Sequence, residues 1–282
     1  GFLTDENMRF RDDPIRFHVR PPREVDFEAE ARLEWPRVAM TVGDFRLEVD
    51  TGYLNAGEIV GIMGPNGIGK TTFIKELVNY YSKSSQNQLQ VSYKPQYVSS
   101  SYDGTVDELL SSVVDESSFS LFNDEVMRPL SIGKLLDRQV NELSGGELQR
   151  VAIAACLGKS AQVYLLDEPS AYLDVEDRLA VARALRHLID SRQAFALVVE
   201  HDIVAQDFVA DRIMVFRGTP SINGQGSTPM PLREAMNLFL SEMGITFRRD
   251  PETKRPRINK LDSKLDKEQK KAGEFYYVSA SD

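Results

Sequence analysis

Short apolar runs alternate with amphipathic stretches along most of this 282-residue chain. Residues 58–63, 163–167 and 195–199 are apolar except for Glu58 and Asp167 at the ends of the first two runs, which is typical of strands that are buried on both faces of a parallel sheet. Residues 45–49 instead alternate, with Phe45, Leu47 and Val49 on one side, which predicts a strand with one buried face. Similar patterns predict further strands at residues 37–42, 89–96 and 211–216.

Helical periodicity separates these strands. Residues 71–80 and 232–243 each present apolar side chains on one face, and a third helix buries Leu179, Ala182, Leu185 and Leu188. Residues 97–142 combine Ser-rich turns with short helical pieces, which indicates an inserted helical subdomain. We interpret residues 1–31 as a linker or an edge extension, and residues 218–231 as a Gly-, Pro- and Ser-containing loop.

Composition narrows the class of protein. A hydrophobic content of 41% supports a sizeable core, and no apolar run is long enough for a transmembrane helix. The single cysteine, Cys156, excludes a disulfide framework or a cysteine-ligated cluster within this chain, and its apolar surroundings predict a small buried side chain. These features lead us to expect a cytoplasmic protein.

The charge is distributed unevenly. A net charge of −9 argues against a generally basic nucleic-acid binder. Residues 245–282, however, carry more Lys and Arg than Asp and Glu. A contact with RNA or with an acidic protein and a merely solvated tail both remain open on this evidence.

A glycine-rich segment between a predicted strand and a predicted helix carries the strongest chemical signal. It fits the pattern G-x-x-x-x-G-K-[ST], in which backbone N–H groups and a helix N-terminus face phosphate groups. The lysine reaches the β- and γ-phosphates, and the first hydroxyl after it can ligate Mg²⁺. The predicted ATP-binding residues of this phosphate loop (residues 64–72) are Gly64, Pro65, Asn66, Gly67, Ile68, Gly69, Lys70, Thr71 and Thr72.

Polar side chains follow three of the predicted strands, at the edge where ligands bind in open α/β sheets. Asp167 is expected to hold Mg²⁺, and Glu168 to orient or deprotonate water. Gln96, at the end of another strand, is expected to reach Mg²⁺ or the attacking water. His201 follows the strand at residues 195–199, and we expect it to contact the γ-phosphate.

A second anion-facing helix start lies at residues 143–150, Leu-Ser-Gly-Gly-Glu-Leu-Gln-Arg. Ser144 is suited to cap this helix, and the glycine amides that follow can face a phosphate. We call residues 143–147 the signature segment, which consists of Leu143, Ser144, Gly145, Gly146 and Glu147.

Two aromatic residues upstream of the phosphate loop are candidates to stack on a nucleobase. Trp35 is favoured because a Trp-Pro pair fits a core poorly, although core packing is an equal alternative. Phe45 lies on the buried side of its alternating strand and is expected to be a core residue.

These motifs, in this order, resemble those of an ATP-binding cassette (ABC) ATPase domain over about residues 32–243. Ser92-Tyr-Lys-Pro-Gln96, residues 143–150, Asp167-Glu-Pro-Ser-Ala-Tyr-Leu-Asp174 and Val199-Glu-His-Asp202 narrow the resemblance to the RNase L inhibitor family, or ABC subfamily E, the ribosome-recycling ATPases. Residues 245–251 and 255–261 resemble that family's C-terminal hinge. Where the family has Tyr-Pro before the first strand of the domain, this chain has Trp35-Pro36.

The resemblance implies an α/β fold with a mostly parallel core sheet, an N-terminal antiparallel β subdomain and a helical insertion at about 97–158. It also implies hinge segments at residues 1–31 and 244–282 around one ABC domain, the second of two in the family. Catalysis would fall to Glu168, His201, Gln96 and Lys70, and Mg²⁺ would be bound by Thr71, Gln96 and Asp167. The signature segment would serve the nucleotide of the first ABC domain, and the D-loop (residues 170–174) would contribute Ser170, Leu173 and Asp174.

The same resemblance implies the partners. They are the first ABC domain and the iron–sulfur domain of the full-length protein, the small ribosomal subunit with its rRNA and proteins, and release or rescue factors. Initiation factors are a further expected group, and no membrane is expected. ATP and Mg²⁺ are the expected cofactors, with no iron–sulfur cluster in this chain. The hinge arginines Arg248, Arg249, Arg255 and Arg257 are expected to support hinge packing or a ribosome contact.

Other classes share part of this pattern. The ATPase subunit of an ABC transporter would have the same cassette motifs, but it would not account for the hinge-like tail. A DNA-repair or chromosome-maintenance ATPase would interrupt the domain with long heptad repeats, which the sequence does not contain. A scaffold that only binds nucleotide is disfavoured by Glu168 and His201.

Overall fold

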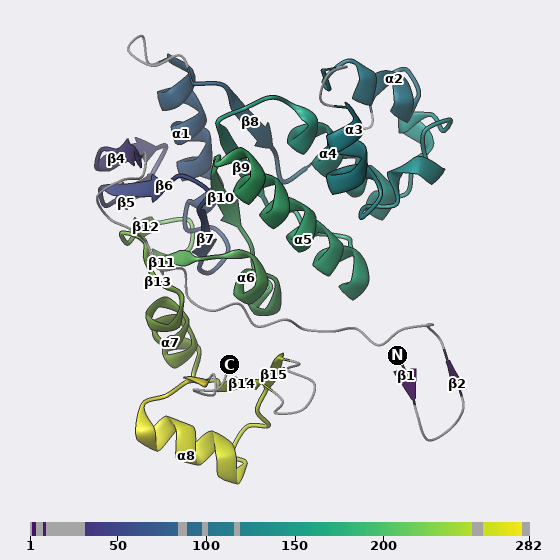
Figure 1. The fold of residues 1–282 in the computed structure, drawn as a ribbon. Helices are drawn as coiled ribbons and strands as arrows, with labels where there is room; N and C mark the ends of the chain where they lie inside the picture. Colours follow the sequence, from purple (N-terminus) through teal and green to yellow (C-terminus); the bar gives the residue numbers. More distant parts are fainter. Residues whose placement is uncertain are drawn as a thin grey trace. The chain divides into compact units, whose positions relative to one another are not determined.

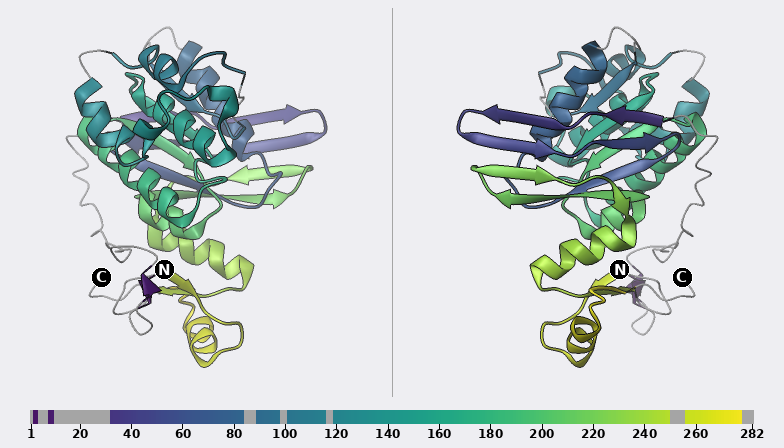
Figure 2. Two further views of the ribbon diagram at one scale, coloured as in Figure 1. Left: turned by 90° about the vertical axis from the view of Figure 1, so that its right-hand side faces the viewer. Right: turned by 90° about the vertical axis from the view of Figure 1, so that its left-hand side faces the viewer.

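The chain divides into two compact units, Glu24–Ala235 and a second unit that combines Gly1–Arg23 with Met236–Asp282. Figures 1 and 2 show the ribbon from different sides. The structure is a computed structural model, and it describes residues 2–3, 8–9, 32–83, 89–97, 101–115, 119–249 and 256–277. The predicted linker at residues 1–31 falls mostly outside the described residues.

Among the described residues, nine strands form the central sheet of Glu24–Ala235, in the order β4-β5-β12-β11-β7-β10-β9-β8, with β13 paired to β11. Strands β11, β7, β10, β9 and β8 run parallel to one another, whereas β12 and β13 are antiparallel to β11. Strands β4 and β5 are antiparallel, and β3 pairs with β6 in a separate antiparallel ribbon. This arrangement confirms the predicted α/β fold class. The strand bounds are β3 (Arg32–Trp35), β4 (Val38–Val42), β5 (Phe45–Val49), β6 (Gly52–Asn55), β7 (Ile59–Met63), β8 (Val91–Lys94), β9 (Val163–Asp167), β10 (Phe195–Val199), β11 (Arg212–Thr219), β12 (Asn223–Gly226) and β13 (Met230–Pro231).

Both faces of the parallel strands are covered, which explains their continuously apolar sequences. On β9, Val163 and Leu165 belong to one hydrophobic cluster, together with Phe73 of α1 (Lys70–Lys83). Tyr164 and Leu166 belong to a second cluster, formed with α4 (Gly145–Gly158) and α5 (Val175–Arg192). Figure 1 shows α1 and α5 on opposite sides of these strands. A further helix, α6 (Ile203–Val209), follows β10.

The predicted helical insertion is present as a series of short helices that precede α4. Thr105 caps the first of them, because its side chain and that of Glu108 exchange hydrogen bonds with each other's backbone N–H. Val106, Leu110 and Phe122 then join the core that α4 and α5 share. The bounds are α2 (Val106–Ser111), α3 (Phe119–Phe122), the π-helix η2 (Asn123–Met127) and the 3₁₀-helices η3 (Ile132–Lys134) and η4 (Val140–Glu142).

The interpretation of residues 218–231 as a loop was wrong, because this segment contains the end of β11 and the strands β12 and β13. Strand β12 lies between β11 and β5 and consists of Asn-Gly-Gln-Gly. A Cβ on Gly224 would lie 2.0 Å from the Ile68 carbonyl oxygen, so the close approach of two backbones requires glycine here. A strand with this composition has no apolar alternation to reveal it.

The C-terminal part of the chain forms its own small sheet, in the order β15-β14-β16. The division between the two units falls inside α7, between Ala235 and Met236, whereas the sequence placed the boundary after residue 243. The second half of α7 belongs to the C-terminal unit, where Asn237 Oδ1 accepts a hydrogen bond from the Tyr276 N–H, at 2.8 Å. The bounds are α7 (Leu232–Met243), β14 (Phe247–Arg249), β15 (Pro256–Ile258), α8 (Lys264–Ala272) and β16 (Tyr276–Tyr277), with β1 (Phe2–Leu3) and β2 (Met8–Arg9) paired at the N-terminus.

Candidate nucleotide site

The phosphate loop connects β7 to α1, as its sequence predicts. Gly64 has a φ of 149°, and a Cβ there would lie 2.4 Å from the Phe216 carbonyl oxygen. This position therefore requires glycine for both conformation and space. Pro65, Asn66 and Gly67 are exposed at the tip of the loop, whereas Ile68 is buried beneath it. The loop thus presents backbone to solvent at the start of a helix, where an anion binds well.

Lys70 is the first residue of α1, and its side chain turns back into the phosphate loop. The Nζ atom donates hydrogen bonds to the carbonyl oxygens of Gly64 and Pro65, at 2.9 and 2.6 Å. Burial lowers the pKa of Lys70 to about 8, although the nearby Glu168 and Asp167 carboxylates oppose the shift. The ammonium group therefore lies among phosphate-loop carbonyls, close to both acids.

Asp167, at the end of β9, is fully buried. Among the described residues, neither of its carboxylate oxygens has a hydrogen-bond partner at normal distance, although the Thr71 side chain lies close enough to interact with it. Burial raises the pKa of Asp167, while the Thr71 side chain and the Lys94 and Lys70 ammonium groups act in the opposite direction. An orphaned carboxylate next to a threonine hydroxyl fits Mg²⁺, which prefers oxygen ligands. The third predicted ligand, Gln96, is half-buried just beyond β8, which pairs with β9 in parallel.

Glu168 and His201 lie together at the same edge of the sheet. Register pairs Val199 with Asp167, so the residues that follow the two strands are neighbours. His201 Nε2 is 2.8 Å from Glu168 Oε1. The Glu168 backbone has a φ of 47°, which is uncommon for a residue other than glycine. Both side chains are partly exposed, at 34% for His201 and 20% for Glu168, so they can reach a bound ligand.

The signature segment forms a capped helix start at the surface. Ser144 Oγ accepts a hydrogen bond from the Glu147 N–H, and Glu147 Oε2 accepts one from the Ser144 N–H at 2.9 Å. The Ser144 hydroxyl also donates to Glu147 Oε2, at 2.7 Å, and this bond, with the Ser144 N–H and the Arg138 guanidinium, lowers the pKa of Glu147. Ser144 and Gly145 are exposed, whereas Leu143 and Gly146 are half-buried. The N-terminus of α4 is therefore accessible to an anion from outside this chain.

The D-loop joins β9 to α5. Ser170 and Leu173 are buried, whereas Asp174 is exposed and caps α5 by accepting hydrogen bonds from two backbone N–H groups. Tyr172, with a φ of 63° and an exposed fraction of 72%, lies next to the signature segment. Its carbonyl oxygen lies 3.1 Å from where a Gly146 Cβ would be. The D-loop and the signature segment are thus in contact within this chain.

The structure corrects the assignment of Trp35 as a base-stacking residue. Trp35 is only 2% exposed, packs edge-on against Phe73, and donates from Nε1 to the Asp50 carbonyl oxygen. It is therefore a core residue, and Gly52 provides the space for its ring. Phe45 was expected in the core, but it is half-buried and its ring lies about 3.0 Å from where a Cβ on Gly69 would be. Phe45 thus places a half-buried aromatic ring beside the phosphate loop.

The hinge arginines differ in exposure. Arg249 is buried and Arg248 is half-buried on β14, whereas Arg257 is exposed on β15 and is paired in register with Arg248. Arg255 lies outside the described residues. Of the three hinge arginines that the structure describes, Arg257 is the most exposed.

The sequence analysis missed three buried polar residues next to the site. Lys94 Nζ donates to the carbonyl oxygens of Asp167 and Glu168, and burial lowers the pKa of Lys94 to about 8. Gln149 Nε2 donates to the Glu168 and Pro169 carbonyl oxygens. Glu200 accepts hydrogen bonds from the backbone N–H groups of Ser170, His201 and Asp202. The sequence pattern concealed Lys94, because the apolar Val91 and Tyr93 are the half-buried residues of β8, whereas the polar Ser92 and Lys94 are buried.

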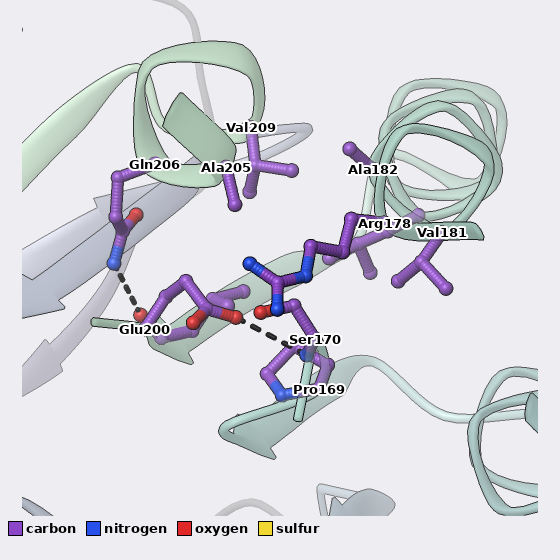
Figure 3. Close-up of a pocket in the computed structure, with 11 residues that line it drawn as sticks. Pro169, Ser170, Arg178, Val181, Ala182, Glu200, Ala205, Gln206 and Val209 are labelled. Atoms are coloured by element: carbon purple, nitrogen blue, oxygen red, sulfur yellow. Dashed lines mark hydrogen bonds between the residues drawn. The ribbon is translucent and has the colours of Figure 1, made fainter. Parts of the chain in front are cut away.

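Figure 3 shows the small pocket that adjoins this network, lined by residues of the D-loop, α5 and α6. Glu200 reaches the Ser170 N–H at one end, and Gln206 donates to the Val198 carbonyl oxygen at the other. Arg178 pairs with Asp202, at 2.5 Å, and donates to the Leu173 carbonyl oxygen. The D-loop and the turn that contains His201 are therefore tied together by side chains.

Comparison with known proteins identifies the class. The ABC transporter family model matches residues 47–171, which include the phosphate loop, the signature segment and Asp167-Glu168. The sheet, the phosphate loop and the strand-end acids agree with this match. The larger unit is an ABC ATPase domain. No helix in the described part of the chain is both long and apolar enough to cross a membrane.

Relatives narrow the class to a family. ABC transporter E family member 3 of Arabidopsis thaliana is 41% identical over 162 residues, which cover 54% of this chain and 90% of that protein. The chain belongs to this E family of ABC proteins, the RNase L inhibitor family. An uncharacterized ABC transporter ATP-binding protein of Methanocaldococcus jannaschii is 51% identical over 284 residues, or 99% of this chain and 47% of that protein. The chain thus spans about half the length of such relatives.

Similar solved structures agree with this family assignment. The crystal structure of a complex of the archaeal ribosomal stalk protein aP1 with the archaeal ribosome recycling factor aABCE1 matches 99% of this chain and 54% of the other, with a TM-score of 0.88 and 52% identity. A model of ribosome-bound archaeal Pelota and ABCE1 matches 99% of this chain and 47% of the other, with a TM-score of 0.88 and 51% identity.

Proposed function

We propose that this chain binds Mg-ATP at the edge formed by the phosphate loop and the ends of β8, β9 and β10. The observation that carries the proposal is the convergence of Lys70, Asp167, Glu168 and His201, four residues from three distant parts of the sequence. A triphosphate would replace the Gly64 and Pro65 carbonyls as the partner of Lys70, which gains a stronger, charge-assisted interaction.

Each side chain has a defined task in hydrolysis. Mg²⁺, held by Thr71, Asp167 and Gln96, would neutralise charge on the phosphate oxygens. Glu168 accepts a proton from, or orients, the attacking water, and His201 contacts the γ-phosphate while its ring fixes the Glu168 carboxylate. Phe45, beside Gly69, takes the stacking role first assigned to Trp35.

A complete site requires a second ABC domain. The exposed Ser144 and Gly145 are accessible to a nucleotide held by another domain, and the D-loop beside them offers Tyr172 to the same partner. We expect that partner to be the first ABC domain of the full-length protein, which also carries an iron–sulfur domain. The isolated chain should therefore bind Mg-ATP but hydrolyse it slowly, and brisk turnover by a verified monomer would contradict this.

The full-length protein is proposed to recycle ribosomes. ATP-driven closure of two ABC domains would split the ribosome into subunits after release or rescue factors have acted, and the protein would then stay on the small subunit, where it contacts rRNA, ribosomal proteins and initiation factors. Support comes from the aABCE1 ribosome recycling factor and the ribosome-bound ABCE1 among the similar structures. A cytoplasmic location follows from this role.

Co-sedimentation with small ribosomal subunits tests the ribosomal part of the proposal. The full-length protein should pellet with small subunits in the presence of a non-hydrolysable ATP analogue and remain in the supernatant without nucleotide. Binding that ignores nucleotide, or no binding at all, would contradict the recycling role. The nucleotide site would be unaffected by that outcome, because ATP binding is measured separately.

A further inference from the structure

Two buried side chains from different elements converge on the backbone that follows β9. Lys94, at the end of β8, donates from Nζ to the carbonyl oxygens of Asp167 and Glu168, at 3.0 and 3.2 Å. Gln149, on α4, donates from Nε2 to the carbonyl oxygens of Glu168 and Pro169, at 2.9 and 3.1 Å. Lys94 is 1% exposed and Gln149 is 3% exposed, so neither can leave these partners for water.

The shared target of the two donors is the Glu168 carbonyl. Glu168 has a φ of 47°, a conformation that needs its surroundings to hold it in a residue other than glycine. Its N–H donates to the Val199 carbonyl oxygen, at 2.9 Å, so both sides of its backbone are fixed. The side chain that leaves this backbone reaches His201. The direction of the Glu168 carboxylate therefore depends on the two donors.

Gln149 also links the Glu168 backbone to the signature segment. It lies on the helix whose first turn is Gly145, Gly146 and Glu147, about half a turn beyond the end of the signature segment. Because a helix moves as a rigid element, a displacement of the signature segment is transmitted to Gln149 and then to the Glu168 carbonyl. The signature segment serves the nucleotide of the opposite domain, whereas Glu168 serves the nucleotide of this chain.

We propose that Lys94 and Gln149 are positioning residues that orient Glu168 by clamping its carbonyl, and that Gln149 couples Glu168 to the signature segment. This inference rests on the proposed ATPase function. Neither residue contacts nucleotide in this scheme, because their polar atoms are bound to main-chain carbonyls. Loss of this clamp, which consists of Lys94 and Gln149, should therefore lower the rate of ATP hydrolysis and leave ATP binding nearly unchanged.

The test uses the full-length protein with Gln149→Met, which keeps the length of the side chain and removes the N–H donors. We expect kcat for ATP hydrolysis to fall at least about 10-fold while KM changes less than about twofold, as for an interaction that matters in the transition state. Lys94→Met should have the same signature. If Gln149→Met does not fold, Gln149→Asn replaces it in the test. This variant keeps the amide but shortens its reach, and it should show the same fall in kcat.

Gln269 provides a matched control. It is also a buried glutamine whose Nε2 donates to two main-chain carbonyls, those of Phe247 and Glu274, but it lies in the C-terminal unit. Gln269→Met loses the same kind of hydrogen bonds, and it should leave kcat within about twofold of the wild type. A folded Gln149 variant with unchanged kcat, or an equal loss in the Gln269 variant, would overturn the clamp.

A double-mutant cycle tests the coupling. Ser144→Arg blocks the signature segment, and its effect on single-turnover hydrolysis at the Glu168 site is measured with and without Gln149→Met. The account predicts that the Ser144 effect shrinks at least about threefold in the Gln149 background, and equal effects in both backgrounds would refute the coupling. A wild-type protein that does not hydrolyse ATP would instead refute the proposed function itself.

Discussion

His201 Nε2 lies 2.8 Å from Glu168 Oε1, although the two residues are 33 positions apart in the chain. The contact exists because β9 and β10 are parallel neighbours that end at the same level, with Val199 opposite Asp167. The register of the sheet thus aligns the candidate water-activating carboxylate with the candidate γ-phosphate ligand. Such preorganisation is what phosphoryl transfer requires of a protein.

Glu168→Gln should separate binding from hydrolysis. The amide keeps the size of the side chain and can still contact His201, but it cannot accept a proton. We expect ATP affinity to change less than about threefold, while the hydrolysis rate of the full-length protein falls by about 10²-fold or more. Phosphate release and equilibrium ATP binding measure the two quantities, and the closed state should accumulate. Unchanged hydrolysis would remove Glu168 from the mechanism.

Tryptophan fluorescence tests the revised assignment of the stacking residue. Trp35 is the single tryptophan of the chain and is buried against Phe73, so its emission should change little when Mg-ATP binds. Phe45→Ala should weaken ATP binding by about 5-fold or more, since the stacking of a base on an aromatic ring contributes about 1–3 kcal/mol. Strong quenching of Trp35 emission by Mg-ATP, together with unchanged ATP affinity in Phe45→Ala, would show that Trp35 is the stacking residue after all.

Cys156 should be unreactive in the folded protein. Its thiol is buried against Ser92, and burial raises its pKa from 9.0 to about 11. Since the thiolate is the reactive form, an already small fraction at pH 8 becomes smaller still on folding. At pH 8, a thiol reagent should label Cys156 of the native protein only as fast as the protein unfolds. In guanidinium chloride, which unfolds the protein, labelling should be immediate. Labelling of the native protein within seconds would contradict the burial.

Arg257→Ala tests the hinge as a ribosome contact. Arg257 is exposed on β15, so its removal should leave the fold intact, unlike a change at the buried Arg249. If the side chain binds a phosphate of rRNA, small-subunit affinity should drop about 2- to 10-fold, and its salt dependence should weaken. Lys260→Ala, another exposed cation of the same unit, is the control. Equal affinity for both variants and the wild type would favour a merely solvated tail.

Sequence reasoning succeeded where chemistry or packing leaves a repeating pattern. The phosphate loop, the Asp167-Glu168 strand end and the signature segment each have a spacing that the chemistry imposes. Doubly buried strands such as β9 are apolar along most of their length because both faces are covered, and β9 departs from this only at Asp167. Their register then follows, and it brings His201 to Glu168.

The features that escaped prediction depend on contacts between distant segments. Strand β12 lies between two others with almost no apolar side chains, because its glycines admit the Ile68 backbone. Trp35 lies in the core because Gly52, across the β3–β6 ribbon, leaves space for its ring. Lys94 and Gln149 looked like ordinary polar residues, and their role becomes visible only once the carbonyls of Glu168 are located.

Calorimetric titration of this chain with ATP tests the central claim most directly. The account predicts one ATP per chain, binding that requires Mg²⁺, and a loss of about 10-fold or more in Lys70→Ala and Asp167→Ala, because each removes a charged partner of the Mg-triphosphate. Lys75→Ala, an exposed lysine on the same helix as Lys70, should bind like the wild type. Equal affinity in all four proteins, or binding that is indifferent to Mg²⁺, would contradict the convergence of these residues on one nucleotide.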